Sequence, residues 1–313
     1  MSDTSTKNTD LRKSALPFVS VVMPAYNSEK FISKCLDPLS EQDYPKELYE
    51  IIVVDNGSID RTPEIARKYE KVELLFEIDV HSSYAARNTG IKKSRGEIIA
   101  LIDADCIPEM NWITEGVKAM IESNADMVGG PVKYFFDKMT GAELFDAYSH
   151  FNNEKLILEK RAALTGNLFL RRRVFEEFGL FPQDAESGAD FRFTNGAINA
   201  GFSIVYAENA IVWHPTRKLF GLLKKVYRTG RGMPKAFRQI GEKNTRFIAF
   251  RRFIKDLLIP KKPFYFKRWS MEKNLNLNAM KLIRMDFAHW LTTAVYKFAI
   301  MIETFRSKTK GSI

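Results

Sequence analysis

The sequence predicts an α/β fold with a mostly parallel central sheet. Short apolar runs alternate with helical patterns through the first two hundred residues, which is typical of βαβ units. The chain has 313 residues, 45% of them hydrophobic, and is therefore long enough to bury a substantial core. Three of the apolar runs end in polar clusters, and ligands bind at the carboxyl ends of strands in open parallel sheets. We therefore expect a buried sheet with a ligand site at one edge.

Strands are expected where an apolar run of strand length is bounded by turn residues. The first four are predicted at 18–24, 49–55, 71–77 and 97–103. Two later strands are predicted at 125–135 and 163–172. The fourth run raises a functional question, because it leads directly into the carboxylates of Asp103 and Asp105.

Helices are expected between these strands. Asn27 or Ser28 can cap the first helix. Its apolar residues fall on one side and are Phe31, Ile32, Cys35, Leu36 and Leu39. Asp60 can cap a second helix that reaches Tyr69, with Pro63 tolerated in its first turn. A later helical pattern covers 189–201.

The composition changes after His214. Residues 217–268 hold 17 Lys and Arg against two acids, Glu242 and Asp256, and interleave them with apolar residues. Residues 278–305 are strongly apolar but interrupted by charges, which favours an amphipathic helix over a membrane-spanning one. We therefore predict three parts, which are a disordered lead at 1–17, an α/β domain at 18–216 and a basic, largely helical extension at 217–313.

The charge and the cysteine content narrow the possible function classes. The formal net charge of +10 indicates an anionic partner, which nucleic acid, a nucleotide, a phosphorylated substrate or a membrane surface would each satisfy. Cys35 and Cys106 lie far apart without CxxC spacing, so neither a disulfide framework nor a zinc cluster is indicated. The polar N-terminal segment has no signal-peptide core, and no run reaches the roughly 18 apolar residues of a membrane span. A reducing cytoplasm is the simplest setting.

The polar clusters begin at Pro24, Asp55 and Asp103, each at the carboxyl end of a predicted strand. Asp103 and Asp105 are two positions apart, so extended backbone can point both side chains to one side. Their hard oxygens suit Mg²⁺ or Mn²⁺ bridging a diphosphate. The alternative is that the two acids begin a turn and cap the helix that contains Trp112.

Four motifs follow one another in order, namely P-A-Y-N, D-N-G-S-x-D-x-T, A-A-R-N-x-G and D-A-D. This ordered set, between Phe18 and Pro215, resembles family 2 glycosyltransferases, which have the GT-A nucleotide-sugar-binding fold. The resemblance makes 18–216 a GT-A catalytic domain, in which the first two motifs hold the nucleoside, the third supplies an arginine, and D-A-D binds ribose and metal. These roles fall on Pro24, Ala25, Tyr26, Asn27, Glu29, Asp55, Asn56, Arg87, Asp103 and Asp105.

Each of these assignments has a structural alternative. Asp55 could cap a turn, Arg87 could form a surface ion pair and Tyr26 could pack at a strand end. Such separate roles do not explain the joint pattern. Asn56 stands where many relatives have a second Asp, and because Asp55 would face the base we do not expect a loss of function.

The resemblance also places a catalytic base. Direct displacement at an anomeric carbon needs a base that deprotonates the acceptor hydroxyl, and the family motif puts Asp190 at that position. Ala189 stands where the family often has Glu, and Gly196 replaces its usual Arg. Helix capping is the alternative role for Asp190, and Glu186 or Asp184 could serve as the base if the loop folds differently.

Further assignments come from the same resemblance. The donor sugar and acceptor region is expected to be lined by Thr165, Gly166 and Asn167, and a tight turn that requires glycine is the alternative. His214 is expected at the metal or the diphosphate, with a hydrogen-bonded structural histidine equally open. Arg228 and Arg231 could close over the diphosphate or form a solvated or lipid-facing basic surface.

These features predict an inverting, metal-dependent glycosyltransferase of the hexosyltransferase type, acting in polysaccharide biosynthesis. It would use Mn²⁺ or Mg²⁺, a UDP- or GDP-sugar donor, and a glycan or lipid-linked acceptor. A nucleotidyltransferase is one alternative, although its glycine-rich loop is missing after the first strand. A nucleic-acid-binding protein would not explain the acids at three strand ends, so no nucleic-acid partner is predicted. A non-catalytic sugar-nucleotide-binding protein stays open because Ala189 replaces the Glu.

The C-terminal part predicts peripheral attachment to the cytoplasmic face of a membrane. Anionic headgroups would attract 217–268 at up to about 1 kcal/mol per well-placed basic residue. The side chains that could enter the acyl boundary are Phe287, Trp290, Leu291 and Phe298. The alternative is that these helices pack on the GT-A core or form a dimer contact.

Overall fold

The fold is described from a computed structural model of the chain. The described residues are 16–149, 153–183, 185, 187–239 and 266–306. Most of the predicted lead at 1–17, the alternative bases Asp184 and Glu186, and residues 240–265 of the basic segment lie outside them.

The described residues form two compact units. The first takes its residues from Met1–Lys133, Phe151–Asp184 and Ala189–His214, and the second from Tyr134–His150, Ala185–Gly188 and Pro215–Ile313. The first unit ends at His214, close to the boundary predicted from composition. The second unit also includes Tyr134–His150, which the sequence-based division places in the first domain.

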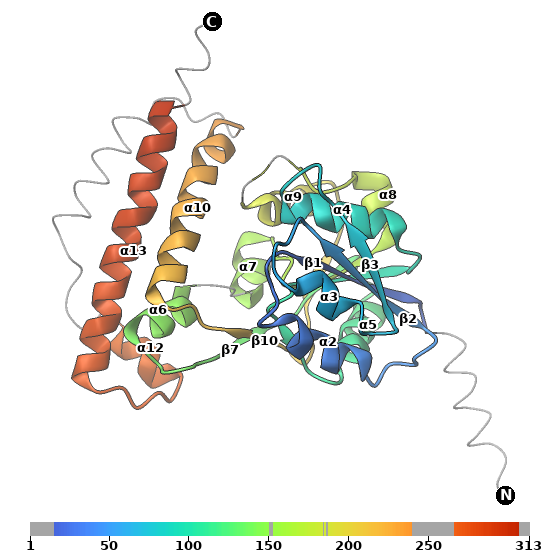
Figure 1. The fold of residues 1–313 in the computed structure, drawn as a ribbon, viewed down its shortest axis with the longest axis horizontal. Coiled ribbons are helices and arrows are strands. Elements are labelled where there is room, and N and C mark those ends of the chain that lie inside the picture. Colours follow the sequence, from blue (N-terminus) through green and yellow to red (C-terminus); the bar gives the residue numbers. More distant parts are fainter. Residues whose placement is uncertain (1–15, 150–152, 184, 186, 240–265, 307–313) are drawn as a thin grey trace, which may run out of the picture. The chain divides into compact units, whose positions relative to one another are not determined.

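A seven-stranded sheet forms the centre of the first unit (Figure 1). Its strands, in spatial order, are β3 (Val72–Phe76), β2 (Tyr49–Asp55), β1 (Val19–Ala25), β4 (Ile98–Ile102), β8 (Asn167–Arg171), β6 (Met127–Gly129) and β9 (Ile204–Tyr206). The first four run parallel, β8 is antiparallel to both of its neighbours, and β6 is parallel to β9. The predicted α/β fold with a mostly parallel sheet is therefore confirmed.

The strand order predicts a ligand site at the ends of β1 and β4. From β1 the chain moves outward to β2 and β3, then crosses back to add β4 on the other side of β1. Open α/β sheets bind ligands at such a switch point, outside the carboxyl ends of the strands. The register pairs Ala25 with Asp55 and Val22 with Leu101, so the polar clusters that follow these strands come out at one edge.

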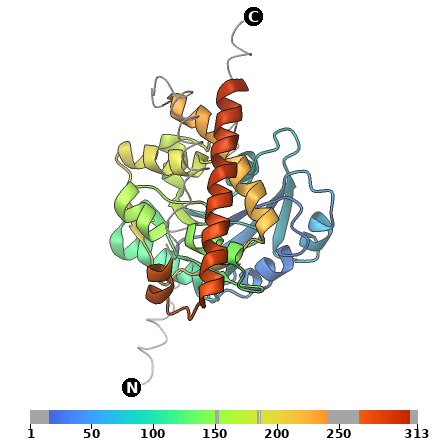
Figure 2. The ribbon, with the colours of Figure 1, turned by 90° about the vertical axis from the view of Figure 1, so that its left-hand side faces the viewer.

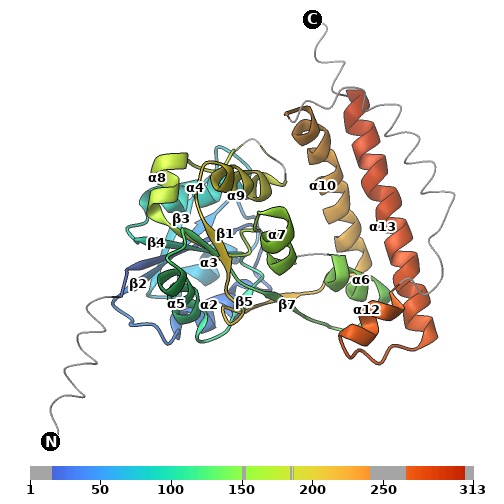
Figure 3. The ribbon, with the colours of Figure 1, turned by 180° about the vertical axis from the view of Figure 1, so that it is seen from behind.

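The helices of the first unit are α2 (Ile32–Ser40), α3 (Thr62–Ala66), α4 (Ser83–Lys93), α5 (Trp112–Ser123), α7 (Asn153–Lys160), α8 (Arg172–Phe178) and α9 (Ala189–Asn199). Four of the five apolar residues predicted to share one side of α2 are fully buried in the sheet's core, and these are Ile32, Cys35, Leu36 and Leu39. Figure 3 shows the same unit from behind, with α5 and α2 on one side of the strands.

The predicted helix caps are not confirmed. Asp60 accepts a hydrogen bond from the Thr62 amide at 3.0 Å, but the N-cap of α3 is Arg61, without a side-chain cap bond, and α3 ends at Ala66 and not at Tyr69. No side chain in the described part of the chain caps α2. The Asn27 side chain instead accepts from the Ile59 amide, because it joins two loops of the site described below.

The strand predicted at 125–135 is two strands in two different sheets. β6 ends at Gly129, and β7 (Val132–Phe135) joins a three-stranded sheet in the order β5 (Ile107–Pro108), β10 (Val212–Pro215) and β7. Gly130 and Pro131 separate them, and a Cβ on Gly130 would lie 2.1 Å from the Ala210 carbonyl oxygen. The sequence run is continuous, but close backbone contact at glycine allows the chain to change sheets there.

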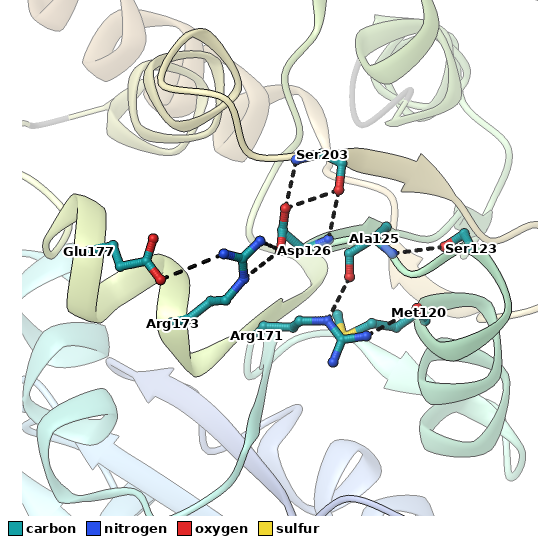
Figure 4. A network of polar contacts seen from close by, with 8 residues as sticks. All are labelled: Met120, Ser123, Ala125, Asp126, Arg171, Arg173, Glu177 and Ser203. Carbon is teal, nitrogen blue, oxygen red and sulfur yellow. Dashed lines mark hydrogen bonds and ion pairs between the residues drawn. The ribbon is translucent and has the colours of Figure 1, made fainter.

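Asp126 anchors the beginning of β6 (Figure 4). Its carboxylate accepts hydrogen bonds from the amide and hydroxyl of Ser203, at 2.9 and 3.0 Å, and from Arg173 Nε at 2.8 Å. Arg173 also pairs with Glu177 at 3.6 Å. Burial alone would raise the pKa of Asp126, but the hydrogen bonds from Ser203 and Arg173 outweigh it, and the pKa is lowered. The carboxylate therefore joins β6, α8 and the turn before β9.

We expect Asp126→Ala to lower the free energy of unfolding by about 2 to 3 kcal/mol at neutral pH, since it removes a buried, multiply bonded carboxylate. Because the folded pKa of Asp126 is lowered, this contribution is full above the unfolded pKa of about 3.9 and disappears as pH falls through the folded value. Urea denaturation at several pH values measures it. Glu41→Ala, in an exposed ion pair with Lys46, is the control and should cost under about 1 kcal/mol. An Asp126 variant no less stable than that control would contradict the anchoring role.

The second unit is helical in its described part, with α6 (Gly141–Ser149), α10 (Leu219–Gln239), α12 (Lys267–Glu272) and α13 (Ala279–Arg306). The amphipathic helix predicted at 278–305 is α13, which Figure 2 shows along its whole length. It lies beside α10 (Figures 1 and 3). The two backbones come close at Gly230, where a Cβ would lie 2.5 Å from the Tyr296 carbonyl oxygen.

The second unit has an apolar core of its own. It contains Ala142, Leu144, Phe145, Leu222, Phe266, Leu282, Met285 and Ala288. The predicted membrane-facing residues Phe287 and Phe298 stay 55% and 43% exposed on α13. Among the described residues, no helix is both long and apolar enough to cross a membrane.

Two buried carboxylates of α6 hold the chain segment that enters α10. Glu143 accepts hydrogen bonds from the amides of Asp137 and Thr140, at 3.0 and 2.8 Å, and from the Thr216 hydroxyl at 3.3 Å. Asp146 accepts from the Arg217 amide at 2.8 Å. This pairing explains why Tyr134–His150 belongs with the C-terminal helices although it is distant from them in sequence.

Candidate active site

The loops that follow β1 and β2 are tied into one surface at the sheet edge. The Asn27 amide donates to Ser58 Oγ and the Asn27 side chain accepts from the Ile59 amide, both at 2.9 Å. Asn27 itself adopts a φ of 49°, a left-handed conformation that Asn tolerates well. Beside it, Tyr26 is 58% exposed, while Pro24 and Ala25 are buried in β1. The Tyr26 side chain is therefore accessible to a ligand.

Glu29 contributes to the same connection between the loops. Its amide donates to Asp60 Oδ2 at 3.1 Å, and its carboxylate accepts from the Arg61 amide at 3.3 Å. Burial would raise the pKa of Asp60, but its hydrogen bonds to Thr62 and to the Glu29 amide lower it. The position of the first motif is thus fixed by the second.

Asp55 lies at the end of β2 and is only 2% exposed. One carboxylate oxygen accepts from the amides of Gly57 and Ser58, at 3.1 and 2.9 Å. The other, Oδ2, is buried and has no hydrogen-bond partner among the described residues. An unpaired buried acceptor costs about 1 to 3 kcal/mol, so this oxygen is suited to accept from a ligand.

Asn56 holds the loop that leads into α4. Its side-chain nitrogen donates to the carbonyl oxygens of Glu77 and Val80, at 2.7 and 2.9 Å. An ionised Asp can only accept hydrogen bonds, whereas Asn can donate two. Asn56 therefore has a local reason to replace the family's second Asp, because the carbonyl oxygens of Glu77 and Val80 both need a donor there.

The A-A-R-N-x-G motif lies in the buried part of α4, a helix that packs on the sheet. Arg87 is buried, forms an ion pair with Asp103 and donates to the Ser83 carbonyl at 3.3 Å. Its Nε has no partner within the described ranges. Gly90 allows α4 to lie flat on β1, since a Cβ there would lie 2.5 Å from Val22 Cγ1. The alternative of a solvated surface ion pair does not apply to Arg87.

The next residue of the motif orders the loop that precedes the predicted base. Asn88 donates to the Phe181 carbonyl at 2.8 Å and accepts from the Phe181 amide at 3.1 Å. Both groups are buried. One helix therefore positions the arginine at the end of β4 and the loop between α8 and α9.

Asp103 and Asp105 follow β4 with partly exposed carboxylates, at 27% and 33% side-chain exposure. Their oxygens and the sulfur of Cys106 lie within 4.8 Å of one another. Burial raises the pKa of the Cys106 thiol well above its usual range, so the carboxylates are the anionic donors. Hard carboxylate oxygens fit Mn²⁺ or Mg²⁺, and the residues present therefore fit the predicted cation.

His214 lies on β10 and comes to the same place. Its Nε2 is 3.3 Å from Asp105 Oδ2, and the ring is 1% exposed. The neighbouring Trp213 donates to Glu109 at 3.0 Å, which fixes β10 beside the loop after β4. The geometry accommodates both roles considered for His214, a cation ligand and a partner that orients Asp105.

Asp190 lies in the first turn of α9 and faces Tyr84 of α4. Its Oδ1 accepts from the Tyr84 hydroxyl at 3.2 Å and from the Phe191 amide at 2.9 Å. Burial raises the pKa of Asp190, although the Phe191 amide and the Arg87 charge act in the opposite direction. A carboxylate with a raised pKa is a stronger base, which suits deprotonation of a hydroxyl. The Arg87 guanidinium lies 5.7 Å from the centre of the Tyr84 ring, so the base and the Arg87–Asp103 pair share one neighbour.

An aromatic cluster and one hydroxyl hold α9 in place. The ring centres of Phe181 and Phe193 are 4.3 Å apart. Thr194 Oγ1 donates to the Asp190 carbonyl at 2.9 Å and accepts from the Ala163 amide at the same distance. A Cβ on Gly196 would lie 2.8 Å from the Phe178 ring, so the ring occupies the space beside the position of the family's arginine.

Thr165 and Gly166 form the buried turn before β8, and the buried Asn167 is the first residue of that strand. The Asn167 amide is fully used inside the fold. Its nitrogen donates to the carbonyls of Pro131 and Ala210, at 2.9 and 2.7 Å, and its oxygen accepts from Trp112 Nε1 at 2.8 Å. With no exposed surface, Asn167 acts as a structural residue, and we leave it out of the proposed donor contacts.

Tyr84 and two arginines of α10 are the remaining residues that bear on the site. The sequence does not indicate Tyr84, because a tyrosine in a helix gives no signal until its partner is known. Arg228 and Arg231 lie on α10 in the second unit, and Arg231 pairs with Glu303 of α13 at 3.6 Å. Their predicted closure over the diphosphate stays a prediction.

Residues 20–179 match the family model described as glycosyl transferase family 2. Glycosyltransferase AglE of Haloferax volcanii is 38% identical over 282 residues, which cover 88% of this chain and 93% of that protein. A dolichyl N-acetyl-alpha-D-glucosaminyl phosphate 3-beta-D-2,3-diacetamido-2,3-dideoxy-beta-D-glucuronosyltransferase of Methanococcus voltae is 26% identical over 217 residues, covering 64% of this chain and 67% of that protein.

Two solved structures have a similar fold. The mannosyltransferase PcManGT of Pyrobaculum calidifontis, in complex with GDP-Man and Mn²⁺, superposes with a TM-score of 0.59 at 19% identity, covering 94% of this chain and 88% of that chain. TarS of S. aureus in complex with UDP superposes with a TM-score of 0.53 at 18% identity, covering 94% of this chain and 92% of that chain. At these identities the similarity concerns the fold alone.

Proposed function

Because the chain belongs to glycosyl transferase family 2 and is a nucleotide-sugar-dependent glycosyltransferase, we propose that it is an inverting enzyme that uses Mn²⁺ or Mg²⁺ and transfers its sugar to a glycan or lipid-linked acceptor. Asp190 would serve as its general base. One observation carries the proposal, which is that three kinds of group lie around one edge of the sheet. They are the unpaired buried oxygen of Asp55, the carboxylates of Asp103 and Asp105 with His214, and the Asp190 carboxylate, whose pKa is raised.

The nucleoside would bind across the ends of β1 and β2. Asp55 Oδ2 would accept an N–H from the nucleobase, which both uracil and guanine can donate, so this contact suits UDP and GDP alike. Tyr26, exposed beside it, offers a face on which the base can pack. PcManGT binds GDP-Man and TarS binds UDP, and the two known structures thus leave both nucleotides open.

The diphosphate would lie against the end of β4. Asp103 and Asp105 would hold the cation, with His214 beside Asp105. A bound divalent cation stabilises the negative charge that develops on a departing diphosphate. Arg87 is bonded to Asp103 and has a spare Nε–H, so it holds that carboxylate in place and adds positive charge near the phosphates.

Asp190 would deprotonate the acceptor hydroxyl as that oxygen attacks the anomeric carbon. The attack comes from the face opposite the diphosphate, and a single displacement of this kind inverts the configuration. Tyr84 donates to Asp190 and would orient the carboxylate oxygen that does not receive its hydrogen bond toward the acceptor. The proposed base is thus positioned by the same helix that supplies Arg87.

Of the two proposed acceptors, a glycan and a lipid-linked sugar, the second unit favours the lipid-linked one, presented at a membrane surface. The Methanococcus voltae relative acts on a dolichyl-linked sugar phosphate, as its name states. Phe287 and Phe298 of α13 are exposed apolar side chains, which suits contact with a bilayer surface. We therefore propose peripheral attachment to the cytoplasmic face of a membrane, helped by the basic residues after His214.

The test is release of nucleoside diphosphate from a panel of UDP- and GDP-sugars, with Mn²⁺, with Mg²⁺ and with a chelator. We expect slow release by hydrolysis with one donor, faster release when an acceptor is added, and loss of both with the chelator. Release of pyrophosphate from UTP or GTP in the presence of a sugar 1-phosphate would identify a nucleotidyltransferase instead. Donor binding without any turnover would identify a sugar-nucleotide-binding protein.

A further inference from the structure

The second unit contains a cavity of about 380 Å³ that belongs to no part of the active site described above. It is lined by the segment before α6, the first turn of α6, the start of α10 and the N-terminal third of α13. The side chains and backbone that matter most are Lys138, Gly141, Lys218, Leu219, Arg284 and Phe287. Its volume is within the range of small-molecule sites.

The polar part of the cavity is positively charged. Lys138 and Arg284 are exposed and have no ion-pair partner among the described residues. Lys218 pairs with Asp137 at 2.9 Å in an exposed pair, which an incoming dianion could replace. Glu143 also lines the cavity, but its side chain is completely buried, and its oxygens already accept from the amides of Asp137, Lys138 and Thr140. The cavity therefore presents cations to a ligand.

The backbone of α6 adds hydrogen-bond donors at the same place. The amides of Gly141 and Ala142, in the first turn of this nine-residue helix, have no acceptor within the described part of the chain. Amides at a helix N-terminus favour an anion. A Cβ on Gly141 would lie 2.4 Å from the Arg284 backbone, so the start of α6 lies directly against the α13 turn that carries Arg284.

The remaining wall is apolar. Phe287 is one turn beyond Arg284 on α13, and Leu219 begins α10 next to Lys218. Both are exposed, at 55% and 37%. A ligand that fits such a cavity has an anionic end and an apolar end. Inorganic anions and free sugar phosphates have the first end but lack the second.

We propose that this cavity binds the phosphate headgroup of a membrane lipid, with the phosphate at Lys138, Lys218 and Arg284 and the first part of the lipid chain along Leu219 and Phe287. The inference rests on the membrane part of the proposed function and gives it a defined site. In this proposal the protein attaches to the membrane through a specific cavity. This contact adds to the general attraction between a basic protein and an anionic surface.

Flotation of the full chain with phosphatidylcholine vesicles, with and without phosphatidic acid, tests the charged end. The full chain should rise only with phosphatidic acid, and Arg284→Glu should weaken that binding about tenfold or more. Arg268→Glu makes the same charge change on α12, outside the cavity, where Arg268 pairs with Glu272. It should weaken binding by no more than about threefold. Equal losses in the two variants would overturn the cavity, while the membrane proposal would stand.

A second matched pair tests the apolar end. Phe287→Ala should weaken vesicle binding several times more than Phe298→Ala, because both side chains are exposed on α13 but only Phe287 lines the cavity. Hydrolysis of the donor sugar should be unchanged in all four variants, which shows that they fold. If the two phenylalanine changes had equal effects, α13 would contact the bilayer only in a general way. That result would contradict the proposed cavity site.

Glycerol 3-phosphate distinguishes the lipid from a soluble anion. It should bind far more weakly than phosphatidic acid vesicles, because it leaves Leu219 and Phe287 uncovered. Tight binding of glycerol 3-phosphate that Arg284→Glu abolishes would make this a soluble phosphate site and overturn the lipid assignment. A full chain that ignores phosphatidic acid vesicles would instead remove the membrane part of the proposed function, leaving donor hydrolysis untouched.

Discussion

Asp190→Asn should keep normal donor binding while sugar transfer falls by on the order of a hundredfold or more, as expected when a positioned general base is removed. The amide of Asn is nearly isosteric with the carboxylate and can still accept the hydrogen bond from Tyr84. It cannot take a proton from the acceptor hydroxyl. Donor binding depends on Asp55 and on the carboxylates after β4, and should therefore persist.

Two measurements on Asp190→Asn separate these effects. Calorimetry with the nucleoside diphosphate reports binding, and nucleoside diphosphate release with acceptor reports transfer. Glu176→Gln, an exposed change on α8 in the same unit, is the matched control and should leave both values near those of the parent. Near-normal transfer by Asp190→Asn would sink the assignment and move the base to Asp184 or Glu186.

The pH dependence gives an independent reading of the same base. Burial raises the pKa of Asp190, so the carboxylate becomes ionised, and the enzyme active, only above a pH higher than the usual value of about 3.9. Tyr84→Phe removes a hydrogen bond that stabilises the ionised form. The acid limb of the kcat profile should then move to higher pH in this variant. An unmoved limb would show that Tyr84 only fills space.

The first half of the fold could be predicted because its signals are local. The first four strands are found within one residue of each predicted end, since short apolar runs flanked by turns determine them. The split between β6 and β7 could not be predicted in this way, because it depends on the backbone of Ala210 lying against Gly130. The transfer of Tyr134–His150 to the second unit likewise depends on Glu143 and Asp146 binding residues far along the chain.

The candidate site likewise has a part that local sequence predicts and a part that depends on tertiary packing. The placement of Asp103 and Asp105 side by side followed from their spacing and the end of a strand. Their partners did not, because Arg87 and His214 reach them only through the packing of α4 and β10. Asn167 shows the opposite error. A polar residue in a matching motif gives no indication, by sequence alone, that the fold has already used all of its hydrogen bonds.

The carboxylates after β4 give the second large effect. Asp105→Ala should lower the affinity for the nucleoside diphosphate by at least about a hundredfold in the presence of Mn²⁺, because changes even beyond the direct ligands of a metal cost ten- to a hundredfold. With a chelator present, Asp105→Ala and the parent should bind the nucleotide equally weakly. Asp105 contributes through the cation in this proposal, and its removal has no effect once the cation is gone.

Asp55→Asn provides the contrast that makes the result specific. Its buried oxygen is proposed to accept from the nucleobase, so the change should weaken nucleotide binding by a similar factor with Mn²⁺ and with the chelator. Titrating both variants with UDP and GDP, each with and without metal, therefore separates a contact to the base from one made through a cation. If Asp105→Ala bound the nucleotide as tightly as the parent with Mn²⁺ present, the metal role of D-A-D would have to be abandoned. His214 would then act only as a structural partner of Asp105, the second role that its position accommodates.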